Sequence, residues 1–384
     1  MKYLPLSSFL RHLFYLPIGL LGSLACNADW NREVVFPPFG HRVLAQQLLE
    51  GLGVATMGDV RDDSNDEELY SEMLELVYLG DLDGLRHFLL QHPYLDVNHV
   101  YQNGDRGDSL HGFTLLHQAA LHHYVPMLDF LVGQGALLDA QDSEGQTPLH
   151  LSIIYGDSLR TIAALIHLGA RIDIPNHEGL LPVHCAARHG HIRSLLLVLG
   201  QNLREERIRG QGDGFQRDAR GRTFIHYAAA AGQVSVMKLW EELMRDGCLG
   251  YQIPTDHDYN NPLHLAAEAG HVNMIPFLLS CIAEPNLRGE FPMHRAAQHG
   301  NQGFVESLVE RGAKLLVVDR RLHTPLHAAA EAGHLDLVLY FLNNGMDADC
   351  WMTRGLSFGP TPIELALRNG HNSTHQMLLG AANG

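Results

Sequence analysis

A ten-residue phrase recurs along this chain and constrains its fold more than any other feature. It is clearest at Thr324–Gly333 and returns at Asn261–Gly270 and Thr147–Gly156. Each copy opens with Thr or Asn, which cap helices well, and continues with Pro, which loses no hydrogen bond in a first helical turn. Each copy closes with Gly, which suits the left-handed residue that ends a helix. The phrase therefore predicts a short helix that is repeated along the chain.

The fourth position of the phrase sets the period of the repeat. It is occupied by His117, His150, His184, His226, His264, His294 and His327, with Glu364 in the eighth place. The spacings are 33, 34, 42, 38, 30, 33 and 37 residues, and Gly follows six residues later in every copy except the first, which has His123. Apolar residues at helical spacing after the phrase predict a second helix. Because one such helix pair cannot bury its apolar face alone, it must stack on copies of itself.

The Thr-Pro-Leu-His core and the period near 33 residues resemble those of the ankyrin-repeat family. The resemblance implies an all-α repeat solenoid of about nine ankyrin repeats, in which helix-loop-helix units are joined by β-hairpin-like loops. Leu74 to Asn98 keeps the rhythm without the Thr-Pro start, so we interpret it as a degenerate first repeat. The family uses the histidine of the phrase to tie neighbouring loops by hydrogen bonds. Its solenoids normally bind proteins and carry no catalytic site.

The N-terminal residues have a different character from the repeats. Lys2 and Arg11 precede a short apolar run that ends in small residues at Ser23 and Ala25, the pattern of a secretory signal peptide. The run is too short to span a bilayer, which needs about 20 apolar residues. We therefore expect a signal peptide over 1–25, an N-terminal arm and linker over 26–66, the solenoid over 67–380 and a tail over 381–384.

Cys26 directly follows the expected signal peptide, and two outcomes stay open for it. The stretch resembles a bacterial lipoprotein signal, in which this cysteine becomes the lipidated first residue and anchors the protein to a membrane. Ser23 stands where that family prefers Leu, and ordinary cleavage after Ala25 or Ala28 is the alternative. In either case the expected compartment is the periplasm of a bacterium.

Charge and motif content limit the classes of function. The chain has 27 basic and 43 acidic residues, a net charge of -16 that is spread along the sequence, which argues against a nucleic-acid partner. It contains no GxSxG, P-loop, HExxH or Gly-rich dinucleotide motif, and the repeats leave no length for a catalytic domain. Eleven of its 26 histidines fall at two repeat positions, the fourth residue of the phrase and the residue after its Gly, and His189 and His191 have no evident third metal ligand. We expect a non-enzyme without metal or cofactor.

Insertions into a solenoid lengthen loops on one face and often mark the binding face. The longest insertion is Gln201 to Gly221, and others are Met244 to Asn260 and Cys350 to Gly359. Exposed arginine and aromatic side chains are the usual material of binding hot spots. The candidate partner-binding residues are Arg204, Arg207, Arg209, Phe215, Arg217, Tyr251, His257, Tyr259, Trp351 and Phe358. The alternative is that the aromatic rings pack on their own repeats.

Three functions fit these features. The first is an exported scaffold that neutralises a toxic secreted hydrolase, as an immunity protein does. The second is a periplasmic helper that stabilises a resident enzyme, and the third is a secreted effector that binds host proteins. The sequence leaves the partner and the oligomeric state open.

Overall fold

The computed structural model describes residues 63–101, 112–209, 215–245, 252–348, 353–354, 357–358 and 360–383. The expected signal peptide, the arm and Cys26 lie outside these residues. Within them, nine pairs of helices follow one another along the chain. The first helices of the pairs are α4 (Asp63–Leu79), α6 (Leu115–Leu121), α8 (Pro148–Ile154), α10 (Pro182–His189), α12 (Phe224–Ala230), α14 (Pro262–Ala269), α15 (Pro292–Gln298), α17 (Pro325–Ala332) and α19 (Pro362–Arg368).

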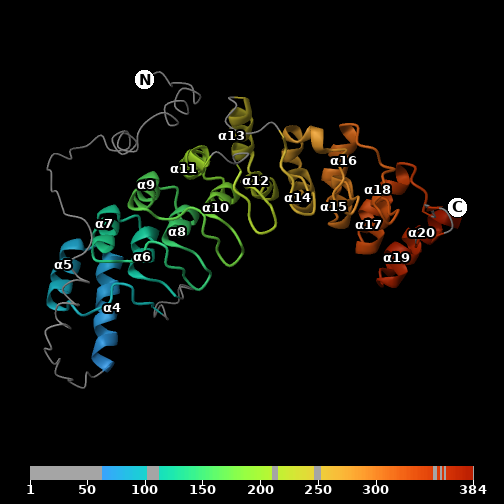
Figure 1. Cartoon of the computed structure of the whole chain (residues 1–384). Coiled ribbons are helices and arrows are strands. Elements are labelled where there is room, and N and C mark those ends of the chain that lie inside the picture. The colour runs from blue at the N-terminus through green and yellow to red at the C-terminus, as the bar shows by residue number, and fades with distance from the viewer. Residues whose placement is uncertain are drawn as a thin grey trace.

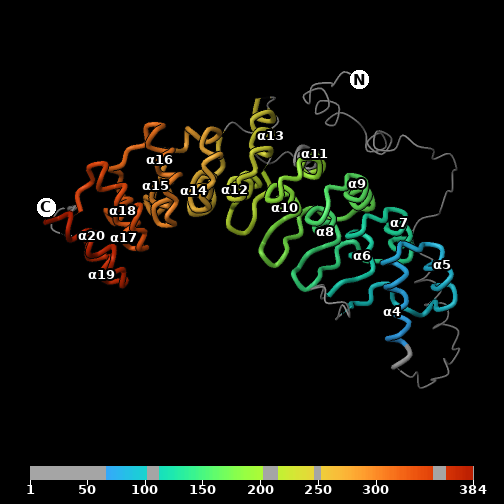
Figure 2. Tube along the Cα trace, turned by 180° about the vertical axis from the view of Figure 1, so that it is seen from behind, coloured from blue at the N-terminus to red at the C-terminus, as the bar shows by residue number. Residues whose placement is uncertain are grey.

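The second helices are α5 (Leu82–Gln91), α7 (Val125–Gly133), α9 (Leu159–Leu168), α11 (Ile192–Arg209), α13 (Val234–Arg245), η1 (Val272–Phe277) followed by η2 (Leu279–Cys281), α16 (Gln302–Glu310), α18 (Leu335–Asn343) and α20 (Asn372–Asn383). First helices pack on first helices in one row, and second helices line up in another row behind them. Figures 1 and 2 show the resulting elongated stack. The predicted all-α repeat solenoid is confirmed.

The core runs through the stack between the two rows. Small side chains such as Ala266 and Ala329 on the first helices allow close packing of neighbours, and large side chains such as Phe224, Phe304 and Phe341 fill the space between pairs. Phe277 is only partly buried. Pro276 lies inside η1 and removes a backbone donor, so this second helix is a 3-10 helix with a different side-chain periodicity.

Left-handed residues end most of the first helices, as the sequence predicts. Gly190, Gly270 and Gly333 have φ values of 74°, 79° and 79°. His123, which replaces Gly in the first copy, has a φ of 61°. Gly156 does not have a positive φ, but a Cβ atom on it would lie 2.1 Å from Nε2 of His123. Close approach by the ring of the preceding repeat therefore explains this glycine.

The segment between the second helix of one pair and the first helix of the next forms a turn, which we call a finger. The side-chain oxygen of an Asp or Asn at its start accepts hydrogen bonds from the backbone two and four residues later. Oδ1 of Asp142, for example, lies 2.9 Å from N of Glu144 and 2.7 Å from N of Gln146. The same bonds form fingers 142–146, 218–222, 256–260, 286–290 and 319–323, and finger 176–180 keeps the second of them.

The ends of the solenoid differ slightly from the expected bounds. The first helix, α4, begins at Asp63, and the last helix, α20, continues to Asn383. Before α19 the chain forms a two-residue antiparallel ladder, β1 (Thr353–Arg354) with β2 (Ser357–Phe358). This last finger is therefore a small β-hairpin.

The histidine of the phrase joins each repeat to the next, as the resemblance implies. In His226, Nδ1 accepts a hydrogen bond from the backbone N–H of Thr223 at 3.1 Å, so Nε2 carries the proton. Nε2 then donates to the carbonyl oxygen of Asn260 in the next finger, at 3.0 Å. Among the described residues, six rings bond both their own cap and the next repeat, and we call them the imidazole ladder: His117, His150, His184, His226, His264 and His294. Five of them donate to the last residue of the next finger, whereas His184 donates to the carbonyl oxygen of Gln216, two residues before finger 218–222, at 3.3 Å.

The imidazole ladder is buried and neutral. Burial lowers the pKa of His117, His150, His184, His226 and His264 from 6.5 to about 4, since a charged ring would be poorly solvated between repeats. The hydrogen bond to the next finger acts in the opposite direction and is the weaker effect. The phrase thus supplies a rigid neutral contact between repeats.

Candidate protein-binding surface

The fingers are aligned by backbone hydrogen bonds between their tips. N of His257 donates to the carbonyl oxygen of Arg220 at 2.8 Å, and N of Leu287 donates to that of Asp258 at 2.8 Å. N of Arg320 donates to the carbonyl oxygen of Arg288 at 2.9 Å. Four fingers, from 218–222 to 319–323, therefore form one continuous edge, which we call the finger-tip surface.

A network of buried polar side chains holds the base of this edge. Nδ2 of Asn260 donates to Oδ2 of Asp256 at 3.1 Å, and Nδ2 of Asn286 donates to Oδ1 of Asn260 at 2.8 Å. Asn286 also donates to Oε2 of Glu290 at 3.0 Å. Nε of Arg222 lies 3.5 Å from Oδ2 of Asp256. Because these side chains come from three consecutive fingers, the tips are fixed relative to one another before any partner binds.

The exposed side chains of the finger-tip surface carry more positive than negative charge. They are Arg220, His257, Asp258, Tyr259, Leu287, Arg288, Arg320 and Arg321. The turn carboxylates Asp218, Asp256 and Asp319 instead accept backbone hydrogen bonds of their own fingers. Fingers 142–146 and 176–180 expose Glu144 and Glu178. In a chain of net charge -16, this local excess of arginine beside an exposed Tyr is a composition common in protein-binding surfaces.

The candidate residues of the sequence divide into several groups. His257 and Tyr259 are exposed on the finger-tip surface, and Tyr259 keeps 59% of its surface exposed. Arg217 is exposed, and its Nη1 donates to the carbonyl oxygens of Gly221 and Thr255 at 3.1 and 3.0 Å. Arg217 therefore links two fingers as well as facing solvent.

Phe215 corrects the expectation of an exposed loop residue. Only 6% of its surface is exposed, and its ring centroid lies 5.9 Å from that of Phe224. The ring closes the core beside α12. This is the alternative in which an inserted aromatic residue packs on its own repeat.

The other candidates lie where side chains are outside the described residues. Arg204, Arg207 and Arg209 belong to α11, which continues to Arg209 where the sequence placed a loop from Gln201 onward. Phe358 lies in β2, and only its backbone is described. Tyr251, Trp351 and Cys26 fall wholly outside the described residues.

The finger-tip surface also contains Leu287, Arg288, Arg320 and Arg321, on the two fingers that follow His257 and Tyr259, and the sequence did not predict them. They stand in repeats of 30 and 33 residues, which have no insertion to mark them. A usable signal does exist. Each lies one or two residues after the Asn or Asp that starts its finger, a position that exposes the side chain at the tip.

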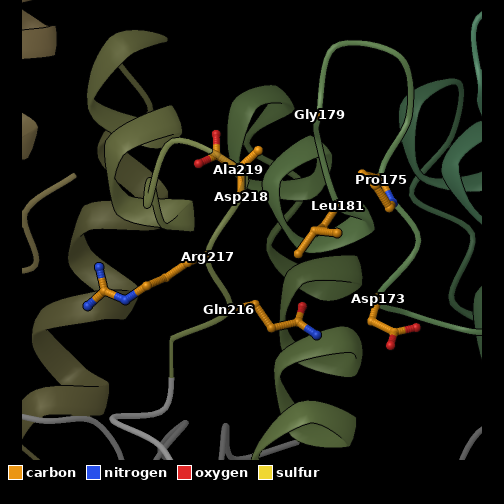
Figure 3. Close-up of a pocket in the computed structure, with 8 residues that line it drawn as sticks. All are labelled: Asp173, Pro175, Gly179, Leu181, Gln216, Arg217, Asp218 and Ala219. Atoms are coloured by element: carbon orange, nitrogen blue, oxygen red, sulfur yellow. The ribbon is translucent and has the colours of Figure 1, made fainter. Parts of the chain in front are cut away.

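One pocket of about 370 Å³ lies between fingers 176–180 and 218–222. It is lined by Asp173, Pro175, Gly179, Leu181, Gln216, Arg217, Asp218 and Ala219. Figure 3 shows the Gln216 side chain directed toward Leu181 and Asp173, whereas the Arg217 side chain points away from the other lining residues. Burial would raise the pKa of Asp218, but hydrogen bonds from Tyr227 and two backbone groups hold it below its usual value. Asp218 is therefore ionised at the edge of the pocket.

Cys185 is the cysteine that lies next to a histidine of the phrase in the described residues. Cys185 is buried beside His184, and burial raises the pKa of its thiol to about 12, so it packs as a small apolar side chain. No group of three or more His, Cys, Asp or Glu side chains in the described part of the chain is arranged to hold a metal ion. Among the described helices, none has the length and apolar character required to cross a membrane.

Comparison with known proteins places the repeats in a family. A family model described as ankyrin repeats matches three times, over residues 74–176, 242–319 and 313–384. The human transient receptor potential cation channel subfamily A member 1 is 28% identical over 245 residues, which is 61% of this chain and 20% of the channel. Its Caenorhabditis elegans homolog is 33% identical over 128 residues, 32% of this chain and 10% of that protein.

A third similar protein is a toxin by name. Alpha-latrocrustotoxin-Lt1a of Latrodectus tredecimguttatus is 35% identical over 115 residues, 29% of this chain and 8% of the toxin. The matched part of this chain thus spans a fifth or less of the length of each of these relatives. The family model, in contrast, covers more than half of this chain and agrees with the helix pairs, fingers and imidazole ladder. This chain belongs to the ankyrin-repeat family and is a protein-binding scaffold of stacked repeats.

Proposed function

We propose that this chain is a non-catalytic scaffold exported to the periplasm, where it binds and neutralises a toxic secreted enzyme. The observation that carries the binding part is the finger-tip surface, with its exposed arginines around Tyr259 and Leu287. Support for export comes from the basic and apolar N-terminal sequence, with lipidation at Cys26 as the proposed anchor. Toxins that act on the cell must be bound where they arrive, which fits an exported scaffold.

The charge of the finger-tip surface suggests the chemistry of the contact. Arg288, Arg320 and Arg321 lie together on neighbouring tips that are joined by a backbone hydrogen bond. Arginine clusters favour carboxylates, and complementary charge speeds encounter and selects the partner. The proposed partner therefore presents an acidic face to this surface.

A capture experiment with matched variants tests the proposal. The tagged full chain is used to isolate partners from its native cells, beside Arg288→Glu/Arg320→Glu and the control Arg160→Glu/Arg245→Glu, which makes the same charge change on the second-helix row. We expect the partner to be captured by the natural chain and the control, and to lose affinity about tenfold or more with the finger-tip variant. Equal capture of the partner by both variants would refute binding through the finger-tip surface.

The identity of the partner then decides the biological role. A stoichiometric hydrolase whose expression kills cells lacking this chain, and spares cells that carry it, would support neutralisation. A housekeeping enzyme that loses activity in cells lacking this chain would instead support a helper that stabilises it. Recovery of the tagged chain inside host cells would point to a secreted effector.

A further inference from the structure

Fingers 176–180 and 218–222 are not joined as the other described fingers are. In neighbouring fingers the third residue of one turn contacts the second residue of the next, as in the bond from N of His177 to the carbonyl oxygen of Glu144 at 2.9 Å. The equivalent pair here is Ala219 and Glu178. Within the described residues, neither N of Ala219 nor the carbonyl oxygen of Glu178 has a hydrogen bond. The solenoid therefore has an open seam at this junction.

A side-chain bridge is missing at the same place. Gln141 stands one residue before its finger, and its Nε2 donates to Gly145 in that finger at 2.7 Å and to Pro175 before the next finger at 3.0 Å. Arg217 occupies the same position in its own repeat and makes the same pair of bonds. In the repeat between them this position is Pro175, which has no side-chain donor. Proline therefore leaves the two fingers without a side-chain bridge, although His184 still joins the two repeats through the carbonyl oxygen of Gln216.

The pocket of about 370 Å³ lies in this seam, and its walls accept hydrogen bonds. Oε1 of Gln216 is buried and has no hydrogen-bond partner in the described residues. The carbonyl oxygen of Glu178, next to the lining residue Gly179, is a second acceptor at the seam, and the lining residues Asp173 and Asp218 are acidic. Leu181 and Pro175 provide an apolar wall. A buried acceptor without a donor is costly, so a guest that donates hydrogen bonds is favoured.

We propose that this seam binds an extended segment of a protein partner that inserts an arginine or lysine side chain into the pocket. The basic side chain donates to Gln216 in a pocket that Asp173 and Asp218 also line, and its stem packs on Leu181. The backbone of the segment pairs with the carbonyl oxygen of Glu178 and the N–H of Ala219, and so replaces the missing contact between the fingers. This inference rests on the proposed function in one respect, that the guest is part of a protein.

A short peptide tests the seam without the natural partner. The peptide acetyl-Gly-Arg-Gly-amide is titrated into the isotope-labelled full chain, and the backbone amide signals of Gly179 and Ala219 are followed by NMR. We expect these signals to move and saturate at millimolar peptide, while acetyl-Gly-Glu-Gly-amide leaves them in place. Absence of any shift at these amides, or an equal response to the two peptides, would overturn the proposal.

Two variants and one matched control sharpen the test. Gln216→Leu removes the buried acceptor, and Pro175→Gln supplies the side chain that bridges the fingers in the preceding repeat. Each is expected to weaken binding of the arginine peptide about tenfold, the effect of one hydrogen bond to a charged group. Pro285→Gln is the control, because Pro285 stands directly before finger 286–290, which is already joined to the next finger by the bond from N of Arg320 to the carbonyl oxygen of Arg288. Its affinity for the arginine peptide should stay within about twofold of that of the natural chain. Unchanged affinity of Gln216→Leu for the arginine peptide would refute the proposed site. That result would not affect the proposal that a partner binds the finger-tip surface.

Discussion

The imidazole ladder makes the stability of this solenoid depend steeply on pH. Its rings are neutral in the folded chain, and burial lowers the pKa of five of them from 6.5 to about 4. In the unfolded chain the same rings take up a proton once the pH falls below about 6.5. The stabilising contribution is therefore fully present above that pH, and it is lost as the pH falls toward 4.

The size of the effect follows from the two pKa values. Near pH 5 an unfolded ring is almost fully protonated and a folded one is mostly neutral, so each ring destabilises the fold by about 2 kcal/mol relative to pH 7.5. Five rings give roughly 10 kcal/mol, which is comparable to the whole stability of an ordinary domain. We therefore expect the solenoid to lose most of its stability between about pH 6.5 and pH 5.

Urea unfolding followed by circular dichroism measures this dependence. The free energy of unfolding is determined at several pH values across the window for the natural chain and for His226→Gln, which removes one ring. The variant should be less stable at neutral pH by about 1–3 kcal/mol, because the buried backbone N–H of Thr223 loses its acceptor, Nδ1 of the ring. Its pH slope should be shallower by up to about 1.4 kcal/mol per pH unit.

His257→Gln is the matched control, because it removes an exposed imidazole outside the ladder. It should leave stability at neutral pH within about 0.5 kcal/mol of that of the natural chain. A flat pH profile of the natural chain across the window, or an unchanged slope in His226→Gln, would refute the reasoning. In either case the rings would not be the groups whose protonation unfolds the stack.

Three further predictions concern the repeats themselves. Gly333 has a φ of 79°, and Gly333→Ala places a Cβ atom 2.4 Å from a ring of the next repeat, so this variant should lower the stability of the solenoid by more than about 1 kcal/mol in thermal unfolding. Gly303→Ala is its control, because the added Cβ inside α16 meets no atom within 4 Å and should leave stability unchanged or raise it. Phe304→Ala should lower the free energy of unfolding in urea by about 3–5 kcal/mol, because the ring is fully buried. Leu316, whose side chain is exposed at 63%, is the control, and Leu316→Ala should change that free energy by less than about 0.5 kcal/mol. The thiol of Cys185 should resist alkylation at neutral pH until the chain is unfolded, and rapid labelling of the native chain would contradict its burial and its pKa of about 12.

The local pattern of the phrase was enough to predict the helix pairs. Capping by Thr147, the short helix after Pro148 and the contact of His150 with its own cap all lie within a few residues of sequence. Such short-range preferences agree with one another in each repeat, so the register along the chain could be read directly. Five of the bonds from the imidazole ladder to the next repeat follow from this register, because those repeats present the same atoms to one another, whereas His184 bonds Gln216 outside finger 218–222.

The details that depend on the neighbour's position could not be read in this way. Phe215 could face solvent or core, and only the packing of α12 decides that it contacts Phe224. Likewise, Pro175 is an ordinary loop proline until the structure places it where Gln141 and Arg217 bridge their fingers. The bridges from Gln141 and Arg217 join residues more than thirty positions apart, so they depend on the exact rise and rotation between repeats. Sequence periodicity sets the order of the repeats, and the tertiary structure decides where two of them stand apart.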